Sequence, residues 1–273
     1  MFNKFGVMQG RLLPKYEQRY QAHPVGYWQD EFPIAENLGL DSIEFILDYN
    51  DAERNPLLAD GGLEEIQAVT TSTSVKVRSI CADYFMEAPI HNQDNSIVAQ
   101  SLIVLDRLIK NAEKLGVSDI VIPCVDHSSL ATDSDMDRFV DNIQSILPVA
   151  EKCCINISLE TDLSPEKFGK LLDRLPSKRI TVNYDIGNSA SLGYDPVEEF
   201  AAYGEKVTDL HIKDRLLGGG SVVLGTGNAN FPVIKKLLKN INYQGLVILQ
   251  AYRDDNGVDV FKKQYEWIKN SLL

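Results

Sequence analysis

Side chains that can carry acid–base or metal chemistry end three short apolar segments in the second half of the chain. Glu160 closes INISLE, Asp185 closes ITVNYD, and His211 lies near the end of VTDLHIK. Each alone has an ordinary explanation, since a carboxylate can cap the next helix and a strand histidine can be a hydrogen-bonded core residue. If the segments are successive strands of a closed barrel, however, the three side chains converge on its axis. Two carboxylates and an imidazole then suit Mn²⁺, Mg²⁺, Zn²⁺ or Co²⁺.

Other apolar segments also end on polar residues. Gln250 closes LVILQ near the C-terminus, where an amide is an unexpected end for a buried strand. Further residues in similar positions are candidate substrate contacts, because the site of a parallel barrel lies at the carboxyl ends of its strands. They are Gln9, Arg11, Glu44, Asn188, Lys213, Arg215 and Arg253.

The segments that would position these residues recur at intervals of about 30 to 40 residues along the chain. Eight of them are present, at 5–10, 42–47, 75–82, 118–124, 155–160, 180–185, 207–213 and 246–250. Their continuous apolar character indicates parallel pairing, with both faces of the sheet buried. Eight such strands alternating with helices predict an α/β fold, the (β/α)8 TIM barrel, and a doubly wound open sheet is the structural alternative.

Amphipathic segments with apolar residues at helical spacing separate the predicted strands. The clearest cover residues 96–116, 136–153 and 164–175. Ser164 before Pro165 is typical of an N-cap followed by proline in the first turn. Gly39 and Gly116 lie where helices are expected to end. The longer stretch from Arg11 to Gly26 predicts an extended loop after the first strand.

The bulk properties suit a soluble protein. The chain has 273 residues, a length that an α/β barrel fills as one domain covering 1–273. Its formal charge of −12 makes nucleic acid and anionic membranes unfavourable partners. Because we find neither an apolar run of membrane-spanning length nor an export signal, we expect a cytoplasmic protein. The four cysteines show no CxxC spacing and are expected to be reduced core residues.

Five segments distributed along the chain carry a family resemblance. They are ISLETD (157–162), NYDIGN (183–188), DLHIKD (209–214), GTGNANF (225–231) and GLVILQ (245–250). Together they resemble the xylose-isomerase-like barrels, which include sugar and sugar-phosphate isomerases and epimerases, inosose dehydratases and endonuclease IV. The resemblance implies a TIM barrel with metal ligands at the ends of its last four strands. In this sequence those positions are Glu160, Asp185, His211 and Gln250.

Gln250 departs from the glutamate that the family has at this position. An amide oxygen can still coordinate a divalent cation, although without a charge, so we expect weaker metal binding. A glutamine cannot accept and return a proton at neutral pH. In the family's two-base epimerases, glutamates on the fifth and eighth strands act on opposite faces of the substrate carbon. The second of these bases is missing here.

Reactions that need one base remain. We expect a divalent-metal-dependent sugar or sugar-phosphate isomerase of carbohydrate metabolism. In it, Glu160 takes a proton from beside the carbonyl and returns it to the neighbouring carbon through an enediolate. A sugar epimerase and a keto-polyol dehydratase, the latter with Lys213 or Asp214 as the acid, are alternatives within the family. A non-catalytic sugar-binding barrel is a further alternative, in which Gln250 marks the lost chemistry.

The substrate is expected to be a small sugar or sugar phosphate. The glycine-rich stretch 215–231 offers backbone NH groups which, with Arg215 and Arg253, could hold an anion. The sequence contains no GxGxxG after a strand and no P-loop motif, so no nucleotide cofactor is expected. A homo-oligomer is compatible with the sequence. An endonuclease-IV-like nuclease is disfavoured, because its zinc cluster is rich in histidine and this acidic chain has four histidines.

Overall fold

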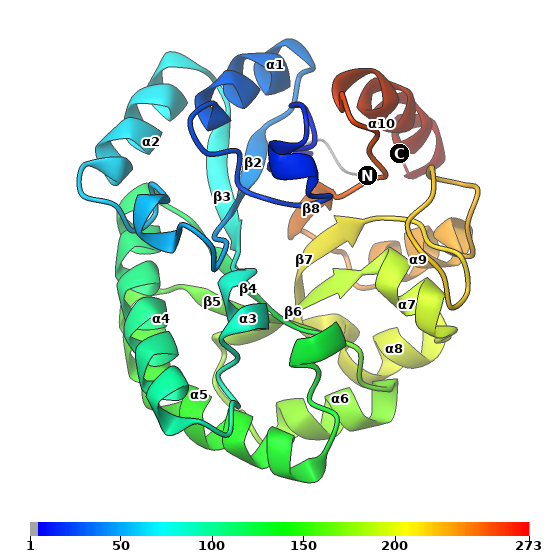
Figure 1. The fold of residues 1–273 in the computed structure, drawn as a ribbon. Coiled ribbons are helices and arrows are strands. Elements are labelled where there is room, and N and C mark those ends of the chain that lie inside the picture. The colour runs from blue at the N-terminus through cyan, green and yellow to red at the C-terminus, as the bar shows by residue number, and fades with distance from the viewer. Residues whose placement is uncertain (1–4, 273) are drawn as a thin grey trace.

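Eight parallel strands close into a barrel in the computed structural model, which describes residues 5–272 (Figure 1). Each strand pairs in parallel with the next along the chain, and the last pairs with the first. This confirms the predicted TIM barrel and excludes the open sheet, which would leave two unpaired edges. The strands are β1 (Gly6–Met8), β2 (Ser42–Ile46), β3 (Lys76–Cys81), β4 (Asp119–Cys124), β5 (Asn156–Thr161), β6 (Ile180–Asp185), β7 (Val207–Ile212) and β8 (Leu246–Leu249).

All eight predicted strands are present, with small differences at their ends. The difference that matters for function is at the last strand, because β8 ends at Leu249 and Gln250 follows it. The backbone NH of Gln250 donates to the carbonyl of Ile248 at 3.1 Å, a local turn that ends the pairing with the neighbouring strands. Gln250 therefore lies at the carboxyl end of the barrel, where the strands lead into the loops that form the site of this fold.

Helices follow the strands along the chain, and the longer helices form an outer ring around the barrel (Figure 1). They are α1 (Glu31–Asn37), α2 (Gly62–Ser72), α3 (Tyr84–Glu87), α4 (Asn95–Leu115), α5 (Asp133–Cys153), α6 (Pro165–Asp173), α7 (Ile186–Leu192), α8 (Pro196–Tyr203), α9 (Phe231–Asn240) and α10 (Val258–Leu272). Two predicted helix signals are confirmed. The hydroxyl of Ser164 accepts a hydrogen bond from the NH of Lys167 at the start of α6. Gly116 ends α4 with a φ of 72°, a left-handed conformation that favours glycine.

Apolar side chains fill the space between the strands and the helices, whereas the inside of the barrel combines buried polar residues with a small apolar cluster of Met8, Ile46, Cys81 and Ile248. Alternation along a strand produces this division. In β7, Leu210 and Ile212 belong to the outer apolar core, while Asp209 and His211 are buried on the other face. Burying polar groups has a free-energy cost unless each finds a partner. Some polar groups inside the barrel are hydrogen-bonded to one another, such as Glu44 with Ser79 and His211. Others, such as the amide of Asn183, have no partner among the described residues.

The four cysteines are free, but they are not all core residues. Cys81 and Cys124 are buried as predicted, whereas Cys153 is partly buried and Cys154 is exposed. The prediction of four core cysteines is wrong for the last two, because they lie where α5 ends at the surface. Cys154 caps that helix with a φ of 58°.

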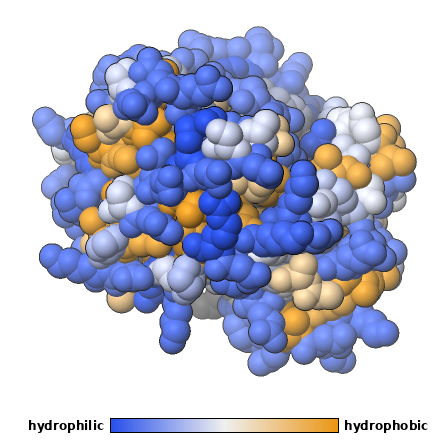
Figure 2. All heavy atoms as spheres, turned by 90° about the horizontal axis from the view of Figure 1, so that it is seen from below, coloured by the Kyte–Doolittle hydropathy of each residue, from blue (hydrophilic) through white to orange (hydrophobic). Residues whose placement is uncertain are grey.

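The outer surface is mainly hydrophilic on the face shown in Figure 2, where hydrophobic residues appear as separate patches between polar ones. Within residues 5–272, no helix combines the length and the apolar character needed to cross a membrane.

Candidate active site

The strand ends bring together the three chemically active residues that the sequence predicts to converge. Glu160 of β5, Asp185 of β6 and His211 of β7 each offer one ligand atom, and these atoms lie within 4.8 Å of one another. Nδ1 of His211 lies 3.6 Å from Oε2 of Glu160. None of the three residues is more than 6% exposed. Neighbouring parallel strands thus place two carboxylates and an imidazole around one buried point.

Two buried ligand atoms at these strand ends have no hydrogen-bond partner among the described residues. They are Nδ1 of His211 and Oε1 of Gln250. Leaving a buried polar atom unpaired costs about 1 to 3 kcal/mol, so a ligand for both atoms would stabilise the site. The set of two carboxylates, one imidazole nitrogen and one amide oxygen fits a divalent cation such as Mn²⁺, Mg²⁺, Zn²⁺ or Co²⁺. Glu160, Asp185, His211 and Gln250 are therefore the residues that would hold it.

Glu44 fixes the imidazole of His211 in the orientation that a metal ligand needs. Nε2 of His211 lies 2.7 Å from Oε1 of Glu44, and both side chains are fully buried. With Nε2–H donating to this carboxylate, the lone pair of Nδ1 faces Glu160. Burial raises the pKa of Glu44 to about 7. The predicted role of Glu44 was substrate contact, but its position behind His211 favours an orienting role.

Asp209 is buried close to Glu44, on the same face of β7 as His211. Burial and the negative charge of Glu44 raise the pKa of Asp209 well above its usual range. Two buried carboxyl groups so close together disfavour a second negative charge, so this environment favours the protonated form of Asp209. The hydroxyl of Ser79 donates to Oε2 of Glu44. The contacts with Ser79 and His211 hold the buried carboxylate of Glu44 in place.

Glu160 has the properties of a general base. Its pKa is raised to about 7, first by burial and then by the negative charge of Asp185. Such a group can take up and release a proton near neutral pH. Nδ2 of Asn188 donates to Oε1 of Glu160 at 2.6 Å and holds the carboxylate in place.

Positive charge borders the carboxylates on one side. Nζ of Lys213 lies 3.2 Å from Oδ2 of Asp185, and Nη1 of Arg215 donates to Oδ1 of Asn188 at 2.8 Å. Lys213 and Arg215 are partly exposed, so they can also reach a bound molecule. The predicted substrate contacts Asn188, Lys213 and Arg215 thus lie together beside the predicted base, Glu160.

Arg11 and Arg253 have different partners from those expected of substrate contacts. Arg253 is 3% exposed and donates to the backbone carbonyls of Gly10 and Leu13 at 2.6 and 2.7 Å. Arg11 is 1% exposed, and its three guanidinium nitrogens are all hydrogen-bonded within the protein. This geometry favours a structural role for both arginines. It supports no direct substrate contact by either arginine.

Gln9 lies at the carboxyl end of β1, close to the site. Its Oε1 accepts hydrogen bonds from the NH of Ile46 and from Nδ1 of His23, both at 3.0 Å. Its Nε2 is buried and has no partner in the part of the chain that the structure describes. The amide oxygen of Gln9 is thus fixed by the fold, while its NH2 group stays available to a ligand, as a substrate contact requires.

Asp214, weighed beside Lys213 as an acid, shapes the glycine-rich loop. Its carboxylate accepts hydrogen bonds from the NH groups of Gly225, Gly227 and Ala229 at 2.9 to 3.1 Å. A side chain at Gly227 would meet Oδ1 of Asp214 at 2.2 Å, so only glycine fits there. With both oxygens engaged by backbone NH groups, Asp214 is poorly placed to donate a proton to a substrate.

Three residues of the site network were missed by the sequence analysis. Asp209 could have been found, because it precedes His211 by two residues and alternation puts both on one face of β7. Gln21 and Asp83 lie in loops far apart in the sequence, yet Nε2 of Gln21 donates to Oδ2 of Asp83 at 2.9 Å. Only the folded chain brings these two side chains together.

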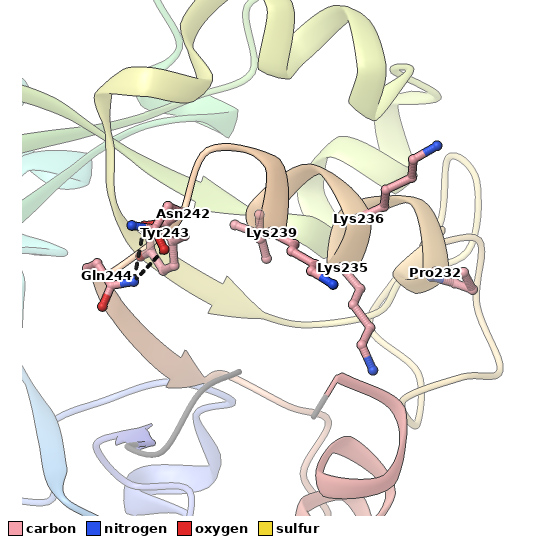
Figure 3. A pocket seen from close by; sticks show the side chains of 8 residues that line it. Pro232, Lys235, Lys236, Lys239, Asn242, Tyr243 and Gln244 are labelled. Atoms are coloured by element: carbon pink, nitrogen blue, oxygen red, sulfur yellow. Dashed lines mark hydrogen bonds between the residues drawn. The ribbon is translucent and has the colours of Figure 1, made fainter.

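An open groove of about 660 Å³ lies apart from these residues, on α9 and the turn that follows it (Figure 3). Its lining contains three lysines and no carboxylate or imidazole. The groove therefore offers neither the carboxylates nor the imidazole found at the strand ends. The residues that line it are Pro232, Lys235, Lys236, Leu238, Lys239, Asn242, Tyr243 and Gln244.

Comparison with known proteins finds relatives of this chain among sugar-phosphate epimerases. L-Ribulose-5-phosphate 3-epimerase UlaE of Salmonella paratyphi A is 25% identical over 262 residues, which cover 91% of this chain and 92% of that protein. The probable L-ribulose-5-phosphate 3-epimerase UlaE of Mycoplasma pneumoniae is 25% identical over 219 residues, covering 77% of this chain and 72% of that protein.

Solved structures show the same fold. The IolI protein with a bound zinc atom has a TM-score of 0.78 at 16% identity, covering 98% of both chains. D-Psicose 3-epimerase from Clostridium cellulolyticum, solved with D-tagatose, has a TM-score of 0.74 at 16% identity, covering 98% of this chain and 99% of that one. The model of the xylose isomerase-like TIM barrel family matches residues 32–271. The chain therefore belongs to the xylose isomerase-like TIM barrel family, and the relatives matched over most of its sequence are named L-ribulose-5-phosphate 3-epimerases.

Proposed function

We propose that the protein is a divalent-metal-dependent enzyme that isomerises a small sugar or sugar phosphate, with Glu160 as its single base. The proposal rests on one observation, the position of Glu160 beside atoms that could bind a metal. The buried carboxylate of Glu160, with its pKa raised to about 7, lies among ligand groups that include two atoms without a hydrogen-bond partner in the described part of the chain, Nδ1 of His211 and Oε1 of Gln250. A base that titrates near neutral pH beside atoms able to bind a metal suits proton abstraction next to a carbonyl. Gln250 adds an oxygen but no second base.

In this reaction Glu160 removes a proton from the carbon beside the substrate carbonyl. It then returns the proton to the former carbonyl carbon on the same face of the resulting enediolate, while the proton of the adjacent hydroxyl moves to the former carbonyl oxygen. A bound divalent cation would polarise the carbonyl and stabilise the negative charge of the enediolate. Asn188 holds Glu160 by its hydrogen bond to Oε1. Lys213 and Arg215 supply positive charge for a phosphate group of the substrate.

A sugar epimerase is the second candidate. The relatives matched over most of this chain are named L-ribulose-5-phosphate 3-epimerases, which favours this reaction. Inversion requires a proton to reach the substrate carbon from the face opposite Glu160. Gln250 cannot deliver one, so an epimerase built on this site would need another proton donor, such as water.

Deuterium incorporation separates these reactions. Protein loaded with Mn²⁺ would be incubated in D₂O with L-ribulose 5-phosphate, D-tagatose and other ketoses with and without phosphate, and the products followed by NMR. Isomerisation gives an aldose, whereas epimerisation gives an inverted ketose that carries deuterium at the inverted carbon. Loss of water from the sugar would identify a dehydratase. Sugar binding with neither exchange nor product would contradict the enzyme assignment and identify a sugar-binding protein.

Several further expectations accompany this proposal and stay predictions. They are the single domain over 1–273, the absence of a nucleotide cofactor, the cytoplasmic location and the homo-oligomer. No nucleic acid or membrane is proposed as a partner, because the net charge of −12 disfavours both.

A further inference from the structure

The orientation of the Gln250 amide decides what this residue can contribute to the site. Nε2 of Gln250 donates to Oε1 of Gln21 at 2.9 Å, while Oε1 of Gln250 is buried without a partner among the described residues. An amide turned by half a rotation would exchange these two atoms and present an NH2 group in place of the oxygen. An NH2 group donates hydrogen bonds and cannot coordinate a cation. The partners of the amide must therefore select one orientation.

Gln21 selects the orientation of the Gln250 amide, because the oxygen and the nitrogen of its own amide are each held by a partner. Its Oε1 accepts a hydrogen bond from Nη2 of Arg11 at 2.9 Å, and its Nε2 donates to Oδ2 of Asp83 at 2.9 Å. A guanidinium only donates and a carboxylate only accepts. Reversing Gln21 would place NH2 against Arg11 and an oxygen against Asp83, two repulsive contacts. The oxygen of Gln21 must therefore face Gln250 as an acceptor, and Gln250 must donate to it through its NH2 group.

Arg11 is itself held in place by hydrogen bonds, so it can fix the position of Gln21 and, through Gln21, that of Gln250. Its Nε donates to the carbonyl of Ala251 and its Nη1 to the carbonyl of Tyr20, both at 3.1 Å. These two contacts join the loop that carries Gln21 to the residue after Gln250. Burial lowers the pKa of Arg11 to about 10, which leaves the guanidinium charged at neutral pH.

We propose that Gln21 is a positioning residue, held by Arg11 and Asp83, that turns the Gln250 amide so that Oε1 becomes a neutral ligand for the divalent cation. The inference deepens the proposed function, on which it rests for the presence of the metal. It assigns Arg11 a role in building the site in place of a substrate contact. Position 250 can thus hold glutamine and remain a ligand because a loop 229 residues away in sequence supplies the acceptor for its NH2 group.

Affinity for Mn²⁺ alone, measured by isothermal titration calorimetry on the full chain, tests this role without any substrate. Gln21→Met has a similar volume and no hydrogen-bonding group, and we expect it to weaken Mn²⁺ binding by about 10-fold or more. Gln250→Ala removes the ligand itself. If Gln21 acts through Gln250, adding Gln21→Met to Gln250→Ala should produce no further loss. Gln93→Met, a substitution at an exposed loop position, is the matched control and should bind as the wild type does.

A double variant that restores Mn²⁺ affinity would distinguish a positioning role of Gln21 from a general effect on the structure. Gln21→Glu combined with Asp83→Asn reverses the donor and acceptor between these two positions. It still offers oxygen atoms to Arg11 and Gln250, so Mn²⁺ affinity should return close to the wild-type value. Should Gln21→Met fail to fold, Gln21→Asn keeps the amide but shortens its reach, and it should also weaken Mn²⁺ binding.

The outcomes distinguish the two proposals. Unchanged Mn²⁺ affinity in folded Gln21→Met, or an equal loss in the Gln250→Ala background, overturns the positioning role and leaves the proposed function in place. If the coupling is observed but the Mn²⁺-loaded wild type gives neither product nor deuterium exchange, the proposed isomerase fails and the positioning role holds. A wild-type protein that binds no divalent cation overturns both.

Discussion

Nε2 of His211 lies 2.7 Å from Oε1 of Glu44, inside the barrel, where neither side chain is exposed. Replacing Glu44 by leucine removes the group that holds the ring, so affinity for Mn²⁺ should fall about 10- to 100-fold. Glu44→Gln retains an oxygen acceptor and should lose less. Calorimetric titration with Mn²⁺ measures both effects. Ser79→Ala, which removes a different partner of Glu44, is the control, and an equal loss there would show that the His211 contact has no special role.

Glu160→Gln should abolish turnover while a divalent cation still binds, more weakly than in the wild type. The amide keeps only one oxygen, so metal binding weakens, and it cannot take a proton, whereas general-base catalysis is worth about 10² to 10⁴ in rate. Deuterium incorporation into the sugar measures the loss directly. The exposed Glu166→Gln on α6 is the matched control. Retained exchange in Glu160→Gln would contradict its assignment as the base.

Gln250→Glu should change both the reaction and the stability. It restores the carboxylate that the family has at this position, so we expect inversion of the substrate carbon to appear or to rise about 100-fold. The new carboxylate also meets Oε1 of Gln21, which now faces an NH2 group. Stability of the metal-free protein should therefore fall by about 1 to 3 kcal/mol. Product analysis and urea unfolding measure the two effects, and a variant with unaltered products would exclude position 250 as the second base.

Arg253 and Arg215 should respond to substitution in opposite ways. Arg253→Met leaves the carbonyls of Gly10 and Leu13 without their donor, so the free energy of unfolding should fall by about 2 to 4 kcal/mol. Arg215→Met should change stability little but raise the KM for a phosphorylated sugar about 10-fold or more. Urea unfolding and steady-state kinetics distinguish these effects. A raised KM with intact stability in Arg253→Met would identify it as a substrate contact after all.

His23 should make the protein less stable in acid. Burial lowers the pKa of its imidazole to about 3, below the usual 6.5 of an unfolded chain. Below pH 6.5 the unfolded state therefore binds a proton that the folded state does not, and the free energy of unfolding falls as the pH is lowered toward 3. Between pH 7 and pH 5 the loss from this group is about 2 kcal/mol.

A substitution isolates this contribution from other titrating groups. His23→Asn removes the imidazole, so its stability should depend less steeply on pH between 7 and 5, whatever its stability at pH 7. His127→Asn is the control, because the His127 side chain is 55% exposed. Urea unfolding at several pH values measures both slopes. Equal slopes for wild type and His23→Asn would show that His23 is not held neutral in the folded state.

The barrel and the identity of three metal-ligand candidates could be predicted because they depend on local patterns. Apolar strands alternating with amphipathic helices determine the fold, and a closed parallel sheet brings its strand ends to one place. Glu160, Asp185 and His211 therefore converge in the structure as the strand order requires. The same alternation within β7 could have identified Asp209.

The sequence by itself determined the barrel, the residues at its strand ends and the glutamine at position 250. The tertiary structure alone decided which groups surround them. It turned Arg11, Arg253 and Asp214 toward backbone or loop partners, and it brought Gln21 to Gln250. The physical reason is that strand periodicity fixes which face a side chain occupies, whereas hydrogen bonds between distant loops depend on how the closed barrel arranges those loops in space.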